Sequence, residues 1–326
     1  MFTAEDIISI NSTKEFHRTA MKIFRFQFEH NEVYQKFCLL LEKTPANVKH
    51  LTEIPFLPIE FFKSKEIVSS IQPLQATFTS SGTTGQITSK HRVTDLSYYE
   101  MSFRTAFSKF YGNIEDYAVL ALLPSYLERD GSSLIYMVND MIENSQHPDS
   151  GFYLDDYKAL AQKLTTLDQQ GQNVLLIGVT YALLDMIEQY PFQLKNTIVM
   201  ETGGMKGRRR EMIREELHHI LSEGFGVQKI HSEYGMTELL SQAYSMGDGI
   251  FECPPWMDIL IRDTEDPLTL LKDGKIGGMN VIDLANYNSC SFIATQDLGK
   301  KYPDYSFEVL GRFDHSDVRG CNLMIL

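Results

Sequence analysis

The chain has 326 residues, of which 43% are hydrophobic, so it can bury a sizeable core without disulfides. With 43 acidic and 30 basic residues its formal charge is −13, which argues against a duplex-DNA coat or a binder of anionic membranes. The four cysteines have no paired CxxC spacing, and the longest uninterrupted apolar run, Tyr117 to Leu123, has seven residues. These features predict a soluble, cytoplasmic protein with no membrane span and no role in nucleic-acid binding.

The first part of the chain is predicted to be largely helical. Apolar residues at helical spacing indicate a helix over residues 14–43, and prolines then break the pattern at Pro55 and Pro58. A second helix is expected over residues 95–110. The apolar run at 117–123 is closed by Pro124, which favours a short buried strand.

The middle of the chain alternates between predicted strands and helices. In chain order these are a strand over 173–178, a helix over 181–189, a strand over 196–201, a helix over about 207–223, a strand over 227–231 and a helix from near Met236. Such alternation is typical of an α/β fold with a largely parallel sheet, whose ligands lie beyond the carboxyl ends of the strands.

After Trp256 the pattern changes to short segments with β character. They cover residues 257–262, 279–284 and 305–310. We expect them to form a smaller β-rich lobe.

The clearest local motif is a turn of small hydroxylated residues and glycines, which comprises Ser80, Ser81, Gly82, Thr83, Thr84 and Gly85. Backbone N–H groups of such a turn can converge on an anion while the hydroxyls supply further donors, and a triphosphate is the natural ligand. The turn is neither a Walker A loop nor a GxGxxG motif. A flexible loop without a ligand is an equally good interpretation of these residues taken alone.

A pair of glycines follows the strand predicted over 196–201. Gly203 and Gly204 could let a flat ring or a phosphate approach the backbone, although a plain strand-to-helix turn is the simpler interpretation. Four cations follow, which could contact an anion or form a solvated turn. They are Lys206, Arg208, Arg209 and Arg210.

Two further motifs carry carboxylates. In the segment HSEYGMTELL, the ring of Tyr234 could stack on a base, Gly235 makes the turn, and Glu238 could hold a Mg²⁺ ion that bridges phosphates. Helix capping by Thr237 and Glu238 is the alternative. Asp297, in TQDLG, could accept hydrogen bonds from ribose hydroxyls, although an ordinary aspartate turn is commoner.

The last segment contains a cysteine beside basic residues. Arg319 and His315 could favour the thiolate of Cys321, which is the nucleophilic form. Cys321 lies nine positions after Arg312, which is a reach of roughly 30 Å for an extended chain. An ordinary cysteine packed against the core is the alternative.

Taken together, these motifs resemble a known superfamily. SSGTTG at 80–85, YGMTE at 234–238, TQDLG at 295–299 and GRFDHSD at 311–317 occur in the order seen in adenylate-forming enzymes of the acyl-CoA synthetase superfamily. Within it the chain most resembles the LuxE-type acyl-protein synthetases, through its ETGGMKGRR segment and its DVRGCNLMIL ending. These enzymes activate a fatty acid with ATP and place the acyl group on a cysteine near the C-terminus.

The resemblance implies a fold and a set of ligand-binding residues. The fold is that of the N-terminal domain of adenylate-forming enzymes, with largely parallel sheets flanked by helices and a smaller β-rich lobe near the C-terminus. The residues implied to bind ATP are Ser80, Ser81, Gly82, Thr83, Thr84 and Gly85 around the phosphates, Gly203, Gly204 and Tyr234 near the adenine, and Asp297 and Arg312 at the ribose, with Gly235 and Thr237 also in the nucleotide site. Glu238 would bind a transient Mg²⁺, and Cys321 would accept the acyl group.

One feature departs from the superfamily pattern. Typical members carry a further C-terminal domain after the GRxD segment, and that domain supplies a lysine for the adenylation step. Here the chain ends ten residues after Ser316. Lys206, Arg208 and Arg319 are candidates to replace its charge, and Lys206 is a candidate catalytic residue.

The sequence thus predicts one multi-lobed adenylation domain without a separate C-terminal domain. Its parts are a helical region over 1–75, an α/β nucleotide-binding core over 76–250, and a β-rich lobe with the tail over 251–326. The expected function is ATP-dependent activation of a carboxylic acid, with acyl transfer to Cys321 and on to a protein partner such as a reductase, transferase or carrier. The alternatives are a ligase that acylates CoA or a carrier directly, and a nucleotide-binding subunit without catalysis.

Overall fold

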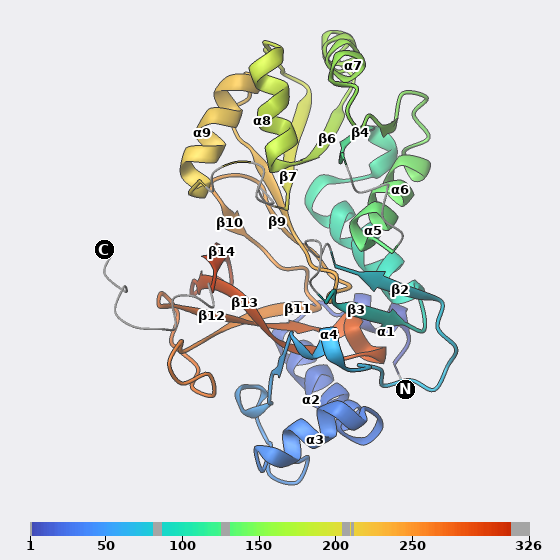
Figure 1. Cartoon of the computed structure of the whole chain (residues 1–326). Helices are drawn as coiled ribbons and strands as arrows, with labels where there is room; N and C mark the ends of the chain where they lie inside the picture. Colours follow the sequence, from blue (N-terminus) through green and yellow to red (C-terminus); the bar gives the residue numbers. More distant parts are fainter. Residues whose placement is uncertain (1, 81–86, 125–130, 204–208, 210–211, 314–326) are drawn as a thin grey trace.

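Two main sheets and a hairpin organise the chain in the computed structural model, which describes residues 2–80, 87–124, 131–203, 209 and 212–313 (Figure 1). The helices are α1 (Ala4–Ile8), α2 (Thr13–His30), α3 (Glu32–Leu40), α4 (Phe61–Ser64), α5 (Ser97–Tyr111), α6 (Ser133–Ser145), α7 (Tyr157–Gln169), α8 (Thr180–Gln189) and α9 (Arg214–Phe225), with 3-10 turns η1 (Leu51–Glu53), η2 (Ile114–Asp116) and η3 (Leu284–Asn288). The strands are β1 (Leu57–Pro58), β2 (Ala76–Thr79), β3 (Lys90–Val93), β4 (Ala118–Leu122), β5 (Gly151–Phe152), β6 (Val174–Val179), β7 (Thr197–Thr202), β8 (His231–Tyr234), β9 (Ala243–Ser245), β10 (Ile250–Phe251), β11 (Met257–Arg262), β12 (Ile276–Asp283), β13 (Phe292–Lys301) and β14 (Phe307–Arg312).

The first main sheet is largely parallel and has the strand order β5-β4-β6-β7-β8-β9. Only β9 runs antiparallel to its neighbour. Every residue of β4 and β6 is buried, because α8 and α9 cover one side of the sheet and α5 and α6 the other (Figure 1). The predicted α/β class with a largely parallel sheet is therefore confirmed.

The second sheet is mainly antiparallel, with the order β10-β14-β13-β12-β11, and β1 pairs with β13 in parallel. Helices α2 and α3 lie against it (Figure 1). Phe24 of α2 packs on Phe292 of β13, and the side-chain amide of Gln27 donates to the carbonyls of Asn286 at 3.0 Å and Tyr287 at 2.9 Å. The β-rich region expected after Trp256 is thus present, and it packs against the helices that begin the chain.

The helix predicted over 14–43 is two helices, because Asn31 interrupts it. Asn31 has the extended conformation (φ −108°, ψ 102°) and its side-chain oxygen caps α3 by accepting from the backbone N–H of Tyr34 at 3.0 Å. Its amide nitrogen donates to the Ser289 carbonyl at 3.0 Å and to the Ser69 hydroxyl at 3.2 Å. A buried asparagine thus joins the two helices to the second sheet.

The helix predicted from near Met236 is wrong. Residues 235–242 form a loop that leads into β9. The backbone N–H groups of Leu240 and Ser241 donate to the carboxylate of Asp283, at 2.8 and 2.9 Å, instead of to carbonyls one helical turn earlier. Tertiary hydrogen bonds therefore override the local helix signal.

Two other boundaries differ from the predictions. The strand expected over 227–231 is β8, which begins only at His231. The helix expected from about Gly207 is α9, which begins at Arg214 and ends where Gly226 takes a left-handed conformation (φ 68°). Among the described residues, no helix combines the length and hydrophobicity that a bilayer crossing requires.

The junction at Asn31 gives the first prediction. Asn31→Ala removes a helix cap and two buried hydrogen bonds, so it should lower the free energy of unfolding by about 2–3 kcal/mol. Ser12→Ala, which removes only the exposed cap of α2, should cost about 1 kcal/mol or less. Urea titrations of both variants measure the difference, and equal costs would show that the buried contacts of Asn31 contribute nothing.

Candidate active site

The two sheets meet at the carboxylate of Asp297. Asp297 and Arg312 are direct neighbours across β13 and β14, and the Arg312 Nε donates to Asp297 Oδ1 at 3.0 Å. The hydroxyl of Tyr234, at the carboxyl end of β8, donates to Oδ2 at 2.9 Å. Asp297 is only 4% exposed, whereas the Arg312 side chain is 74% exposed. The alternative that Asp297 is a simple turn residue is wrong, because it lies within a strand.

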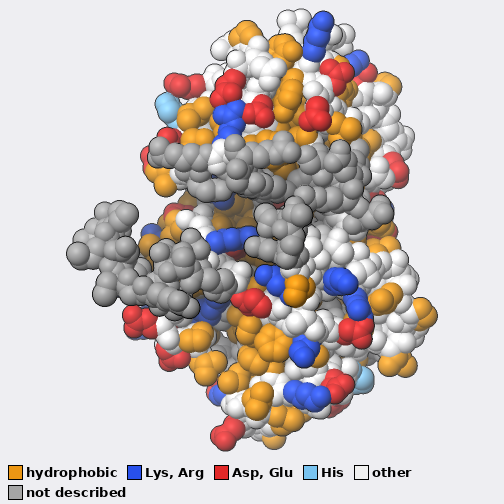
Figure 2. Space-filling view, viewed as in Figure 1, with side chains coloured by type: hydrophobic (Ala, Val, Ile, Leu, Met, Phe, Trp, Pro, Cys, Tyr) orange, Lys and Arg blue, Asp and Glu red, His pale blue; other side chains and the backbone are white. Residues whose placement is uncertain are grey.

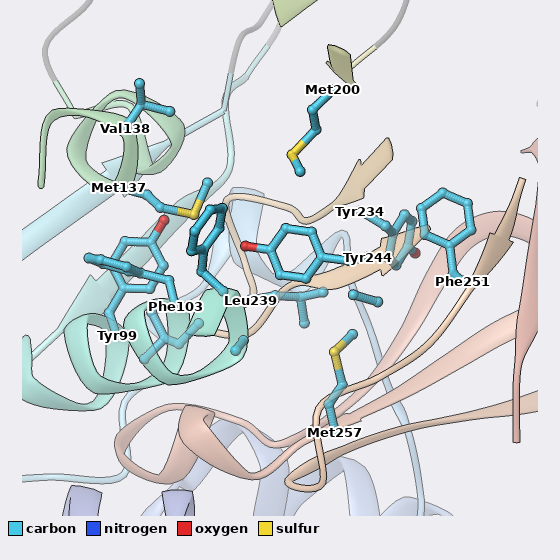
Figure 3. Packing of buried hydrophobic residues seen from close by; sticks show 14 of the residues in the cluster. Tyr99, Phe103, Met137, Val138, Met200, Tyr234, Leu239, Tyr244, Phe251 and Met257 are labelled. Atoms are coloured by element: carbon cyan, nitrogen blue, oxygen red, sulfur yellow. The ribbon is translucent and has the colours of Figure 1, made fainter. Parts of the chain in front are cut away.

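The aromatic ring of Tyr234 is buried. It packs edge-on against Phe251 and Phe307, with ring centroids 6.0 and 5.8 Å away, and Figure 3 shows it beside Phe251. Tyr234 therefore reaches the site mainly through its hydroxyl, which orients Asp297. Each carboxylate oxygen can accept more than one hydrogen bond, so Asp297 keeps acceptor capacity for ligand hydroxyls.

A second group of residues surrounds Glu238. Its side chain is 6% exposed, and burial raises the pKa of its carboxyl group. A hydrogen bond with Ser89 and the positive charges of Arg312 and Lys63 act in the opposite direction. Ser89 also exchanges hydrogen bonds with Ser80, since its N–H donates to the Ser80 hydroxyl at 2.9 Å. The start of the SSGTTG turn, Glu238 and Arg312 are thereby brought together.

Basic side chains surround the hairpin of β2 and β3 that carries this turn. A hollow of about 390 Å³ between α4 and β3 is lined in part by Lys63, Lys65 and Lys90, and by Arg92, whose charge is paired with that of Glu66. A second hollow of about 530 Å³ shares Lys90 and Arg92. Figure 2 shows lysine and arginine side chains gathered in this region of the surface. On a chain of net charge −13, such local positive charge favours an anion near the turn.

The loop that carries Glu238 is fixed from behind by polar side chains. The amide of Asn286 donates to the Glu238 carbonyl at 2.8 Å. His91, the residue of β3 after Lys90, is 1% exposed, with its Nδ1 3.0 Å from the Thr237 carbonyl and its Nε2 2.8 Å from the Ser289 hydroxyl. Since a carbonyl can only accept, Nδ1 carries the proton. The sequence motifs do not reveal that His91 supports this loop, because both partners of its ring, Thr237 and Ser289, lie 146 or more positions away in the chain.

Other predicted residues lie apart from this cluster or outside the described residues. Gly203 follows β7 with φ 72°, and its carbonyl accepts from the Thr180 hydroxyl at 3.1 Å. Arg209 binds the carboxylates of Asp185 and Glu188, so its charge is already paired. The candidates outside the described residues are Ser81, Gly82, Thr83, Thr84, Gly85, Gly204, Lys206, Arg208, Arg210, His315, Arg319 and Cys321.

Glu201, beside Gly203, has a structural environment. It is 3% exposed and pairs with Arg214 at the start of α9, while the Ser232 hydroxyl donates to it at 2.8 Å. Although burial opposes the charged form, contacts with His218, Arg214 and Ser232 lower the pKa of Glu201. Its carboxylate therefore anchors α9 to the sheet.

Comparison with known proteins identifies the family. Residues 8–99 and 142–326 match the family model of the acyl-protein synthetase LuxE. The chain belongs to this family. No curated protein matches the sequence of this LuxE-family member.

Solved structures share the fold. A 2-hydroxyisobutyryl-CoA ligase, crystallised with 2-HIB-AMP and CoA, matches with a TM-score of 0.67 and 12% identity over 93% of this chain and 70% of the ligase. ATP-bound MatB from Rhodopseudomonas palustris matches with a TM-score of 0.55 and 17% identity over 74% of this chain. The chain spans about half of MatB, since 49% of that chain is covered. The LuxE-family chain thus has the fold of adenylate-forming enzymes.

The buried His91 gives a prediction for acid stability. Burial lowers its pKa from 6.5 to about 4, so the folded state favours the neutral ring. Its contribution to stability is present above pH 6.5 and is lost as the pH falls towards 4. His91→Asn keeps a donor near the position of Nδ1 and removes the titration. Between pH 7 and 4 the wild type should lose about 3 kcal/mol more stability than the variant.

Denaturant titrations at several pH values measure this difference. The other titrating groups are common to both proteins and cancel. Parallel stability curves for wild type and variant would contradict the prediction.

Proposed function

We propose that this chain uses ATP to convert a carboxylic acid to an acyl adenylate. The proposal rests mainly on one observation. Tyr234, Asp297 and Arg312 form one contact group, and Glu238 and the start of the SSGTTG turn lie close to it. Membership of the LuxE family and the fold shared with an ATP-bound and an acyl-AMP-bound enzyme support it. A fatty acid is the substrate that the sequence resemblance favours.

In the proposed reaction, the substrate carboxylate attacks the α-phosphorus of ATP, and pyrophosphate leaves. Both groups are already anionic, so little acid–base chemistry is needed, and the protein mainly positions the reactants and neutralises charge. Asp297 would accept hydrogen bonds from the ribose hydroxyls, with Arg312 beside it. Ser80 and the five turn residues after it would hold the phosphates.

A magnesium ion fits this arrangement. No group of three or more His, Cys, Asp and Glu side chains in the described part of the chain could hold a metal. A single buried carboxylate suits Mg²⁺, which keeps several waters and takes its other ligands from substrate phosphates. Glu238 would supply that carboxylate, and the ion would neutralise phosphate charge.

We further propose that the Cys321 thiolate attacks the acyl carbon of the adenylate, which forms a thioester and releases AMP, and that the acyl group then passes to a protein partner. The other three cysteines are poor nucleophiles, which supports this assignment. Burial raises the pKa of the Cys38 thiol to about 12 and raises those of Cys253 and Cys290 as well, so all three stay protonated.

Carboxylate-dependent ATP–pyrophosphate exchange tests the first step. Over a panel of fatty and aryl acids, the wild type should show exchange, and Glu238→Gln should lower kcat/KM roughly 100-fold or more, because it removes charge beside the phosphates. The exposed Glu265→Gln is the matched control and should behave as wild type. Absence of exchange with every acid would exclude both catalytic interpretations and favour a nucleotide-binding subunit.

Labelling with radioactive acid and ATP tests the second step. The wild type should carry a hydroxylamine-labile label that Cys321→Ser lacks, while Cys253→Ser keeps it. Exchange activity should survive in both variants. If Cys321→Ser still carries the label, the acyl-enzyme at this position is wrong and direct transfer to CoA or a carrier is favoured.

A further inference from the structure

Polar side chains gather on one face of β8 and β9, under α5 and α6. Glu233 of β8 and Tyr244 of β9 are directly opposite each other in the antiparallel pair, so both side chains point to the same face. Gln242 lies two residues before Tyr244. Thr202 of β7 is the neighbour of Glu233 in the parallel pair of β7 and β8. Its hydroxyl donates to Glu233 Oε2 at 2.6 Å.

Two polar atoms in this group are buried without a partner. Within the described part of the chain, neither the Tyr244 hydroxyl nor the Gln242 Oε1 has a hydrogen bond, and the two residues are only 1% and 2% exposed. An unpaired buried polar group costs about 1–3 kcal/mol. Figure 3 shows Tyr244 between Met200 and Met257, with its hydroxyl directed towards the side where Tyr99, Phe103 and Met137 lie. Two hydrogen-bonding atoms thus lie without a partner in an apolar environment.

Gly235 connects this group to the proposed reaction centre. It follows Tyr234, whose hydroxyl contacts Asp297, and precedes Glu238 by three residues. A Cβ at position 235 would lie 2.4 Å from Glu233 Oε1 and 3.3 Å from Gln242 Cγ, so only glycine leaves these side chains in place. The carboxyl end of β8 therefore has nucleotide-site residues on one side and the polar group on the other.

We propose that Glu233, Gln242 and Tyr244 bind the part of the acid beyond its carboxylate, and that this part carries a hydroxyl group, an inference that rests on the proposed adenylation. A hydroxyl can donate to Gln242 Oε1 and accept from the Tyr244 hydroxyl, so it satisfies both unpaired atoms. An unsubstituted alkyl chain leaves both unpaired.

The electrostatics favour a hydroxyl over an ammonium group. Burial, with the nearby charge of Glu201, raises the pKa of Glu233 to about 7, although the hydrogen bond from Thr202 acts in the opposite direction. The carboxyl group is therefore substantially protonated at neutral pH and offers little fixed negative charge. An ammonium group also has no acceptor for the Tyr244 hydroxyl.

Exchange measured with matched acid pairs tests the inference on the full chain. Each pair is a hydroxy acid, alkyl or aryl, and its counterpart without the hydroxyl. The preferred hydroxy acid should have a kcat/KM at least about tenfold above that of its counterpart. The counterpart leaves Gln242 Oε1 and the Tyr244 hydroxyl without a hydrogen-bond partner. Tyr244→Phe should bring this ratio close to one, and Gln242→Met should also lower it.

A stability measurement separates binding from folding effects. Tyr244→Phe removes an unpaired hydroxyl and should not lower the free energy of unfolding. Tyr34→Phe is the control, because its equally buried hydroxyl donates to the Pro55 carbonyl at 2.7 Å, and it should cost about 1 kcal/mol without changing the acid ratio.

Two results would overturn the inference while leaving adenylation intact. They are equal or better exchange with the unsubstituted acids, and an acid ratio that Tyr244→Phe does not change. Absence of exchange with all acids would instead reject the proposed function, and this inference with it.

Discussion

A buried carboxylate shared by two sheets holds the candidate active site together. Asp297 accepts from Tyr234 of the parallel sheet and from Arg312 of the neighbouring antiparallel strand, so both of its oxygens have partners. Burying such a group without partners would be costly, and loss of either contact would therefore disturb the packing of the sheets. Since Asp297 and Arg312 are fixed by strand register, the site rests on rigid elements, which suits a reaction that depends on positioning.

Glu238 lies on a loop, but polar contacts from the second sheet hold that loop. Asp283 accepts the N–H groups of Leu240 and Ser241, and Asn286 donates to the Glu238 carbonyl. Burial raises the pKa of Asp283 to about 6, so these hydrogen bonds only partly offset the loss of water. The position of Glu238 is thus set by residues more than forty positions away, and the loop and the second sheet act as one unit.

The sequence predicts those parts of the fold whose pattern is dictated by burial alone. The strands at 118–122 and 174–179 are buried on both faces, so they form continuous apolar runs. The strand β13 is not predicted because Thr295, Gln296 and Asp297 are polar and interrupt the apolar pattern. The break at Asn31 was missed because apolar spacing continues through it, while its hydrogen bonds are tertiary.

The candidate site was predictable as a set of motifs but not as an arrangement. The order of the motifs indicated Glu238, Asp297 and Arg312, yet nothing local indicates that Arg312 and Asp297 are cross-strand partners or that His91 supports the Thr237 carbonyl. The alternation of side chains along a strand adds a spatial relation between neighbouring residues that no motif shows. Tyr234 and Glu233 are consecutive, so they point to opposite faces of β8. One face contacts the residues proposed to hold the nucleotide, and the other contacts α5 and the apolar side chains beneath it. If the second face binds the acid as proposed, substitutions there are expected to change the choice of acid while Asp297 and its partners stay in place.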